Sequence, residues 1–482
     1  MTASSPQAAS STPDPAHAQE RALHVDGDRL VDGAGRRVVL RGFGLGGWMN
    51  MENFITGYPG TEAQMRAALA RVLGPEVFAT FTDRLLADFF TDADAAYLAS
   101  LGLNALRVPF NYRHFEDDAR PFELKEEGFA LLDRVVRACA NHGIYTILDL
   151  HALPGRQNQH WHSDNPTHWA DFWNHSHFQD RAVHLWEALA DRYRDEPWVA
   201  GYNPVNEPAD HTGEVIEPFY RRLESAIRAV DPRHVLFLDG NTYSTDFSMF
   251  HDPFPNTVYT AHDYALPGIT ADGAYPGTVD GRTFDRGVLE QTFLERTAFM
   301  RRTGTPIWIG EFGPIYTGDP GRDAERRQLL ADQLDIYAAH GASWSLWTYK
   351  DVGLQGLAYA RPDSPYVRRI ADVMEVKKRL GTDAWGGSDA GVRQVMEPLE
   401  ALFAQEFPDF APYPWGSRRW LRGLVQHIVL AEPLVGRWAR CFEGVDAAEA
   451  ERLASSFALD ACARRDELAA VLRDHVLAPT GD

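Results

Sequence analysis

Residues 128–151, GFALLDRVVRACANHGIYTILDLH, hold a helix and a strand in direct succession. Apolar residues recur at helical spacing in the first part, which predicts a helix that stops at Gly143. A run of mostly apolar residues from 144 to 151 predicts a buried strand. The segment RAVHLWEALADRYRDEP (181–197) has the same pattern before a strand expected at 199–206. Alternating helices and strands predict a parallel α/β fold.

The same alternation extends over most of the chain. Strands are expected at 38–44, 103–109, 144–151, 199–206, 234–240, 257–262, 307–311 and 343–347. Eight parallel strands are the number that closes a barrel, whereas an open, doubly wound sheet is the alternative. The strand count favours the barrel. We therefore predict an α/β fold, a (β/α)8 TIM barrel with long rim insertions and a C-terminal helical appendage.

Three connections are too long to be simple turns, namely residues 48–91, 152–178 and 265–283. Each follows the C-terminal end of an expected strand, the side on which barrel active sites are built. The insertions are therefore expected to surround a functional site.

The chain is expected to have three parts. Residues 1–22 are rich in Ala, Ser and Pro and predict a disordered tail rather than a signal peptide. Residues 23–384 form the barrel, and residues 385–482 form the C-terminal extension. Beyond about residue 385 strand signals cease, and amphipathic helices are expected over 391–407, 417–442 and 446–476.

Two interpretations of the C-terminal extension are open. Its arginines lie around Trp420 and Trp438, a composition that also occurs in helices on membrane surfaces. The strong acidity of the whole chain favours packing on the barrel or on a second subunit instead.

Composition argues against several classes of protein. The 47 basic and 68 acidic residues give a net charge of −21, which disfavours nucleic acid and anionic lipid as partners. Three cysteines without metal-binding spacing argue against a disulfide framework or a structural zinc. No run of 18 apolar residues is present, so no membrane span is expected. The expected location is the cytoplasm.

Polar and aromatic residues stand where the apolar strands end. These are Arg107, His151, Asn206, Glu207, His262, Glu311 and Trp347, with Asn158 and Tyr264 shortly after two of the strands. Strand ends of a parallel barrel meet at one mouth, so these residues are expected to form one site. An unpaired buried carboxylate is costly, so Glu207 and Glu311 need either partners or a chemical task.

Two carboxylates facing each other suit glycoside hydrolysis, which uses one as acid/base and one as nucleophile. The fourth and seventh strands lie on opposite sides of a barrel, so we predict Glu207 as general acid/base and Glu311 as nucleophile. The other residues are expected to bind the sugar or support this pair. Asn206 is expected to bond the sugar 2-hydroxyl, and Trp347 offers a flat apolar face for a sugar ring. Arg107 and Tyr264 are expected to hold Glu311 in its ionised form, and His262 is expected to lie close enough to adjust the pKa of Glu311.

This ordered set of residues resembles glycoside hydrolase family 5, the cellulase family of clan A, over about residues 24–380. The motif Asn206–Glu207–Pro208 and the pair His262 and Tyr264 carry much of the likeness. The resemblance implies retention of anomeric configuration, a β-linked carbohydrate substrate and no cofactor. The stretch DLHALPGRQN (149–158) is similar to that of the family's exo-acting β-glucanases and β-glucosidases.

The expected substrates are short β-glycosides, with glucose as the glycone and mannose as its nearest rival. Insertions of this size are expected to close the groove into a pocket, which favours exo-action. A transglycosylase using the same glutamates, a catalytically silent sugar-binding barrel and another clan A family are the alternatives. Transfer of product to added acceptors would distinguish the first of these.

Two other motifs have a structural interpretation. Gly42, Gly44 and Gly47 match the dinucleotide-binding spacing G-x-G-x-x-G, but an aromatic, turn-rich loop follows them instead of a helix. Tight packing of the backbone at the rim of the first strand is expected instead. Histidines gather between residues 142 and 184, but without a recognised metal-binding motif, so no metal site is expected.

Overall fold

A closed barrel forms the centre of the protein, whose computed structural model describes residues 20–382, 385 and 389–477. Every pair of neighbouring strands in the barrel is parallel. In sequence order the strands are β4 (Arg41–Gly44), β5 (Ala105–Asn111), β6 (Tyr145–Ala152), β7 (Val199–Asn203), β8 (Val235–Asp239), β9 (Thr257–His262), β12 (Ile307–Glu311) and β13 (Ser343–Leu346). The prediction of a (β/α)8 barrel is confirmed.

Strand β7 ends earlier than the sequence pattern predicts. The prediction extended this strand to residue 206, but the structure ends it at Asn203. Pro204 follows, and a proline has no N–H with which to continue the ladder. Asn206 and Glu207 therefore lie in the loop after the strand, and Glu207 has a left-handed backbone with a φ of 45°.

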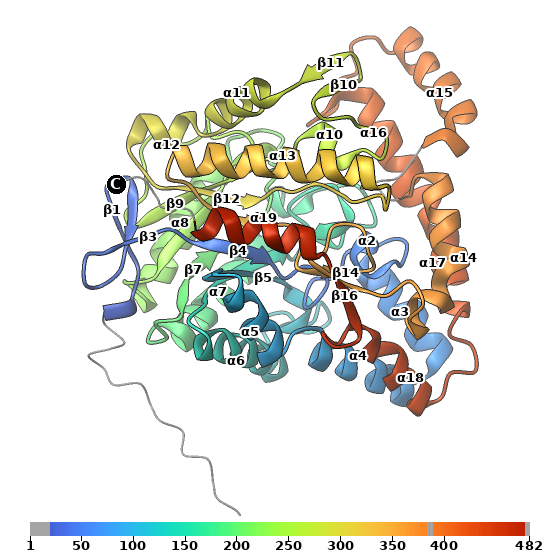
Figure 1. Ribbon diagram of the computed structural model, residues 1–482, viewed down its shortest axis with the longest axis horizontal. Coiled ribbons are helices and arrows are strands. Elements are labelled where there is room, and N and C mark those ends of the chain that lie inside the picture. The colour runs from blue at the N-terminus through green and yellow to red at the C-terminus, as the bar shows by residue number, and fades with distance from the viewer. Residues whose placement is uncertain (1–19, 383–384, 386–388, 478–482) are drawn as a thin grey trace, which may run out of the picture.

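Helices surround the barrel, as Figure 1 shows. They are α5 (Asp92–Ser100), α6 (Glu126–Asn141), α7 (Ser176–Tyr193), α8 (Ile216–Val230), α11 (Arg286–Arg296), α12 (Ala298–Thr303), α13 (Pro320–Ala339) and α14 (Pro365–Leu380). Helix α6 illustrates why they pack here: Phe129, Leu132, Val136 and Cys139 recur at helical spacing and are buried on one face. The side chain of Asp319 accepts a hydrogen bond from the Arg322 N–H and caps α13.

The N-terminal end of the barrel is closed by a small antiparallel sheet of β1 (His24–Asp26), β2 (Arg29–Val31) and β3 (Arg37–Val38). Leu23 and Leu30 from this region pack with Trp308 in a separate apolar cluster at the base of the barrel. In Figure 1 this sheet lies on the left, and α14 lies on the right. This sheet therefore lies at the end of the barrel opposite the C-terminal mouth.

Each of the three long insertions follows the C-terminal end of a barrel strand. The first forms α2 (Asn53–Thr56), α3 (Glu62–Leu73) and α4 (Pro75–Phe89), and the second forms two short 3-10 helices, η2 (Trp161–Ser163) and η3 (Asp171–Trp173). The third forms α10 (Leu266–Ile269) and the hairpin of β10 (Gly277–Val279) and β11 (Arg282–Phe284). The first two insertions bring Glu52 and His162 to the site described below, whereas the third packs against α13.

The glycines of GFGLGG allow close packing at β4, as predicted. A Cβ atom on Gly42 would lie 1.7 Å from the Ala105 carbonyl oxygen, and one on Gly44 would lie 2.4 Å from the Trp347 indole. The next helix, α2, begins only at Asn53, so the glycines do not open a helix that could bind a phosphate. Gly44 instead leaves room for the Trp347 ring.

The C-terminal extension folds mainly as helices. Its elements are η4 (Asp389–Gly391), α15 (Arg393–Glu406), α16 (Gly416–Leu424), a π-helical turn (Val425–Val429), α17 (Ala431–Arg440), α18 (Ala447–Ala454), η6 (Ser455–Phe457), β16 (Cys462–Arg464) and α19 (Asp466–Leu477). The expectation that no strand occurs beyond about residue 385 is wrong, because β16 pairs antiparallel with β15 (Ala358–Ala360). A three-residue strand is too short to produce an alternating pattern, so the prediction of helices over 446–476 missed this break.

The extension and the barrel share one hydrophobic core. The Trp438 ring of α17 lies 6.2 Å from Tyr58, and Phe457 stacks on Phe89 of α4 at 5.5 Å. Trp438 is buried, so its ring cannot contact a membrane surface. The predicted boundary between the barrel domain and the extension falls between residues 384 and 385. Residue 384 lies outside the described residues. In the described part of the chain, no helix has the length and apolarity needed to cross a bilayer.

Candidate active site

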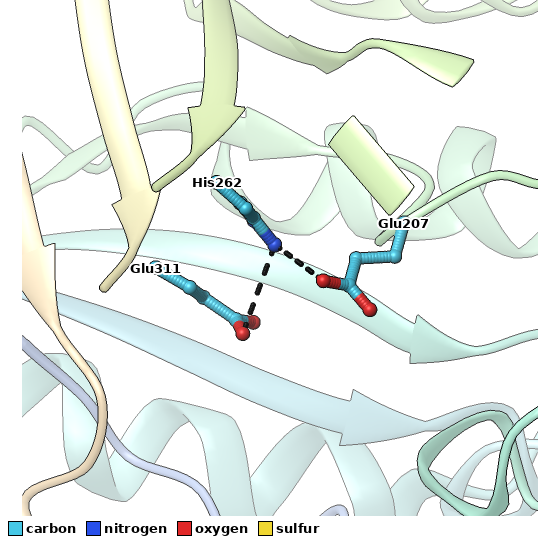
Figure 2. A group of neighbouring side chains, drawn as sticks. All are labelled: Glu207, His262 and Glu311. Carbon is cyan, nitrogen blue, oxygen red and sulfur yellow. Dashed lines mark hydrogen bonds and ion pairs between the residues drawn. The ribbon is translucent and has the colours of Figure 1, made fainter. Parts of the chain in front are cut away.

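The mouth of the barrel brings together the side chains that the sequence singled out. Arg107 lies in β5, His151 in β6, His262 at the end of β9 and Glu311 at the end of β12. Glu207 comes from the loop after β7. Figure 2 shows His262 between the two glutamates, with its imidazole directed toward both carboxylates.

The two glutamates lie close together and are joined through His262. His262 Nδ1 lies 2.6 Å from Glu207 Oε1 and 3.7 Å from Glu311 Oε2. One ligand atom of each of the three residues lies within 4.8 Å of the other two. This spacing fits the carboxylate separation of about 5–5.5 Å found in retaining glycosidases, not the roughly 6.5–9.5 Å of inverting enzymes.

Glu311 is held by two hydrogen-bond donors. Arg107 Nη1 donates to Oε1 at 2.6 Å, and the Tyr264 hydroxyl donates to Oε2 at 2.9 Å. Burial raises the pKa of Tyr264 well above its ordinary value, so the phenol stays protonated. A cation and a neutral donor on the two oxygens stabilise the negative charge that a nucleophile needs.

Arg107 is fully buried and connects four strands. Its guanidinium contacts Asn206 Oδ1 at 2.5 Å, Asn203 Oδ1 at 3.0 Å and Asp149 Oδ2 at 3.1 Å, in addition to Glu311. Burial alone would lower the pKa of Arg107, but the negative charges of Asp149, Glu311 and Asp239 raise it. Because a guanidinium has a fixed planar fork of donors, the partners of Arg107 are held in a defined geometry.

Glu207 lies in a different environment from Glu311. Burial raises its pKa, and the hydrogen bond with His262 partly offsets this effect. Its backbone N–H donates to Asp239 Oδ2 at 2.9 Å, which supports the left-handed backbone at this residue. The second carboxyl oxygen, Oε2, lies 2.9 Å from His162 Nε2. One carboxyl group is therefore paired with a guanidinium, whereas the other lies between two histidines.

His151 and Trp347 form the wall between these residues and the first insertion. Their rings stack at 5.3 Å with an angle of 3° between the planes. His151 Nδ1 lies 2.7 Å from Asp149, and its Nε2 lies 3.3 Å from Asn206 Nδ2. Glu52 of the first insertion approaches His151 Nε2 at 3.4 Å. Glu52 is therefore another buried carboxylate near the two glutamates, in addition to Asp149 and Asp239.

Asn158 lies behind Glu207 and is fully buried. Its Nδ2 donates to the Glu207 carbonyl at 3.0 Å, and its Oδ1 accepts from the His160 N–H at 3.0 Å. Its Nδ2 also lies 2.9 Å from His162 Nε2. The polar atoms of Asn158 are thus bonded to protein, which suits positioning of the loop rather than direct contact with a sugar.

Several site residues were not predicted from the sequence. Glu52, Asp149, His162, Asp239 and Trp385 all lie within this arrangement. Asp149 lies within the apolar strand β6, and Asp239 ends β8. The search for polar residues near the ends of apolar strands, which found the other site residues, could therefore have found these two. Glu52, His162 and Trp385 come from insertions and the extension, where no periodic pattern marks them.

Within the described ranges, the one group of side chains whose spacing suits a metal ion is Glu207, His262 and Glu311. Glu311 already has Arg107 and Tyr264 on its two oxygens. A positive charge is therefore supplied by the protein itself. The histidines of the second insertion pack on aromatic rings instead, for example His160 on Trp161 at 5.2 Å.

These features define a class of protein. Two facing carboxylates at the mouth of a (β/α)8 barrel, one paired with a cation and one whose pKa burial raises, are typical of the retaining glycoside hydrolases.

Sequence comparison identifies the family. A model of the cellulase family, glycosyl hydrolase family 5, matches residues 75–353. The chain is 48% identical over 468 residues to a β-xylosidase of Phanerodontia chrysosporium, a match that covers 94% of this chain and 98% of that protein. The chain belongs to glycosyl hydrolase family 5 and is a retaining β-glycosidase, which confirms the resemblance found in the sequence.

One more distant relative agrees with this assignment, and a solved structure shares the fold. Glucan 1,3-β-glucosidase 1 of Schizosaccharomyces pombe is 25% identical over 361 residues, which cover 65% of this chain and 83% of that protein. A solved structure of an endogalactoceramidase superposes with a TM-score of 0.50 at 20% identity, covering 68% of this chain and 75% of that one. This structural likeness is one of fold.

Proposed function

We propose that this protein is an exo-acting β-glycosidase that releases a terminal sugar from short β-glycosides, with xylose as the preferred glycone. Glu207 is the general acid/base and Glu311 the nucleophile. The single observation that carries the catalytic assignment is the close approach of Glu207 and Glu311 across His262, with their different partners.

The reaction proceeds in two steps. Glu311 attacks the anomeric carbon as Glu207 gives its proton to the glycosidic oxygen, so the C–O bond breaks and the aglycone leaves as an alcohol. A covalent glycosyl-enzyme remains. In the second step, Glu207 takes a proton from water as the water attacks the same carbon, and Glu311 leaves as a carboxylate. His262 stays neutral through this cycle because burial lowers its pKa to about 4.

Contacts between the first two insertions support a pocket. The Asn50 amide donates to the His162 carbonyl at 3.2 Å, and the Ala63 N–H donates to Asp164 Oδ1 at 2.8 Å. Asn50 and Ala63 belong to the insertion after β4, whereas His162 and Asp164 belong to the insertion after β6. Asn50, His162 and Asp164 are buried. The insertions are thus tied together over the mouth, which would block a groove on that side.

The C-terminal extension supports a wall on the side of the nucleophile. Trp385 lies 4.6 Å from Tyr264 and 6.1 Å from Phe54, measured between ring centroids. These three rings come from the extension, the loop after β9 and the first insertion. The rings meet at Tyr264, which donates to Glu311, so the extension lines the site on the side of Glu311.

The identity of the glycone is the first test. The β-xylosidase relative supports xylose, and the glucan 1,3-β-glucosidase relative keeps glucose, the glycone expected from the sequence, as the second candidate. One extra hydroxymethyl group in a closed pocket costs roughly 10–200-fold in kcat/KM. We expect nitrophenyl β-xyloside to exceed the glucoside by a factor in this range, with the mannoside slower still.

Rates on the xyloside, glucoside, mannoside, galactoside and fucoside, measured with one aglycone, decide this point. Equal or faster cleavage of the glucoside would exclude the preference for xylose while leaving the catalytic assignment intact.

The mode of cleavage is the second test. A pocket admits a chain end and excludes chain interiors, so we expect the release of single sugars from short oligosaccharides. Incubation with soluble xylan or β-glucan should leave the viscosity almost unchanged while monosaccharide accumulates. A rapid loss of viscosity with mid-length products would instead demonstrate an open, endo-acting cleft.

A further inference from the structure

His162 contacts the acid/base residue from the side opposite to His262, although nothing in its sequence context marks it. We propose that His162 is a positioning residue whose Nε2 accepts a hydrogen bond from the Glu207 carboxyl group and holds that group in its proton-donating form between turnovers. This inference rests on the proposed role of Glu207 as acid/base.

The orientation of the Asn158 amide is the first step of the argument. Its Oδ1 accepts from the His160 N–H at 3.0 Å, and its Nδ2 donates to the Glu207 carbonyl at 3.0 Å. A backbone N–H can only donate and a carbonyl can only accept, so these two contacts fix which end of the amide is nitrogen. The atom that lies 2.9 Å from His162 Nε2 is therefore an amide NH2 group.

The protonation of His162 follows from this neighbour. An amide NH2 has no accepting lone pair, so it can face His162 Nε2 only if that nitrogen carries no hydrogen. The same Nε2 lies 2.9 Å from Glu207 Oε2. A bare nitrogen and an ionised oxygen would repel at this distance. A proton on Glu207 Oε2 removes this repulsion, and the single lone pair of Nε2 then accepts from both the carboxyl group and the Asn158 amide.

The other oxygen of Glu207 fits the same assignment. His262 Nδ1 lies 2.6 Å from Oε1, and as an N–H it donates to the carbonyl-type oxygen of a protonated carboxyl group. Both oxygens of a neutral Glu207 then have suitable partners. Burial lowers the pKa of His162 to about 4, which agrees with a neutral imidazole that accepts.

Two distant parts of the chain and a neighbouring residue of its own loop hold His162 in place. Its carbonyl accepts from Asn50 of the first insertion, and the neighbouring Ser163 hydroxyl donates to the Asn158 carbonyl at 3.0 Å. The adjacent Trp161 ring lies 4.5 Å from His427 of the C-terminal extension. The extension therefore supports the 3-10 helix that carries His162, which gives it a role in positioning the acid/base residue.

The other ionisable groups near Glu207 and His162 are His262, Glu311, Arg107, Asp149, His151, Asp239, His160 and Tyr243. The charge on Glu311 raises the pKa of Glu207, and the charge on Arg107 lowers it. Neither residue contacts the His162 ring directly. Replacing His162 therefore leaves these charges in place, and a change in the pH profile reports the lost acceptor.

The test is His162→Phe, which keeps a ring of similar size and removes the accepting nitrogen. An acceptor that stabilises the neutral acid raises its pKa, so its removal lowers the pKa of Glu207. A general acid works only below its pKa, so the basic limb of kcat/KM should move to lower pH. We expect a shift of about half to one pH unit, the size that one hydrogen bond supports.

The aglycone provides a second readout. Glycosides of poor leaving groups need proton donation, so kcat/KM on alkyl or sugar aglycones should fall about 3–10-fold in His162→Phe. Dinitrophenyl glycosides need little proton donation and should change by less than about twofold. His162→Gln offers an amide oxygen as acceptor and should restore the wild-type basic limb.

His160→Phe is the matched control, because His160 lies in the same loop and packs on Trp161. It should leave the basic limb and the aglycone dependence unchanged. The proposal would be overturned if folded His162→Phe kept the wild-type basic limb of its kcat/KM pH profile. It would also be overturned if kcat/KM fell equally on alkyl and dinitrophenyl glycosides. If Glu207→Gln also lacks aglycone dependence, the acid/base assignment itself has failed, which separates the two hypotheses.

Discussion

Replacing Glu311 by Gln should reduce kcat by about 10⁴-fold or more, because the covalent route loses its nucleophile. An amide of the same shape carries no negative charge and is a very poor nucleophile toward an anomeric carbon. Folding should survive the change, since Arg107 keeps Asp149, Asn203 and Asn206 as partners. Steady-state rates on an aryl glycoside, together with thermal unfolding, measure both effects.

Trapping the intermediate identifies the nucleophile directly. A fluorinated glycoside that forms the glycosyl-enzyme but hydrolyses slowly should label wild-type protein at Glu311, as found by mass spectrometry of the peptide. The Glu311→Gln variant should remain unlabelled. Glu295→Gln, an exposed residue of α11, is the matched control and should label like wild type. Labelling at another carboxylate would reject the assignment of Glu311.

Replacing Glu207 by Gln should reduce turnover of unactivated glycosides by about 10²–10⁴-fold, the usual contribution of general acid/base catalysis. The loss should depend on the aglycone. Dinitrophenyl glycosides need no proton to leave, so their first step should survive while hydrolysis of the glycosyl-enzyme slows, because no base activates the water. An initial burst followed by slow turnover is the expected time course.

Added azide distinguishes this role from a general loss of structure. Azide is an anion that needs no base, so it should attack the glycosyl-enzyme of Glu207→Gln, raise the rate and yield a β-glycosyl azide. The same anion should not raise the activity of Glu311→Gln on the same β-glycoside. Near wild-type turnover of alkyl glycosides by Glu207→Gln would contradict the acid/base role.

We propose that the two carboxylates differ in function because their neighbours differ, not because of their own chemistry. Arg107 and Tyr264 stabilise charge on Glu311, whereas burial and His162 favour the neutral form of Glu207. Separate environments that push two carboxyl groups apart in pKa are the general means of assigning acid and nucleophile. Glu311→Gln and Glu207→Gln therefore test whether the neighbours of each glutamate give it the proposed role.

The barrel was predictable because its signals are local. Each strand is a short apolar run, and each helix repeats apolar residues at its own period, as in residues 128–151. Parallel strands in a closed barrel direct their C-terminal ends to one mouth. From that rule alone, residues as far apart in sequence as Arg107 and Glu311 were expected to meet, and the structure brings them within 2.6 Å. Their chemical roles stay predictions until the substitutions are made.

The parts that only the tertiary structure decided lie outside this periodic frame. Glu52, His162 and Trp385 reach the site from irregular segments, and β16 pairs with a strand about a hundred residues earlier in the chain. Their positions depend on contacts between distant segments, such as Trp161 with His427, which leave no repeat in the sequence. Local propensity determines which elements form, but the packing of insertions and extension determines which side chains surround the catalytic pair.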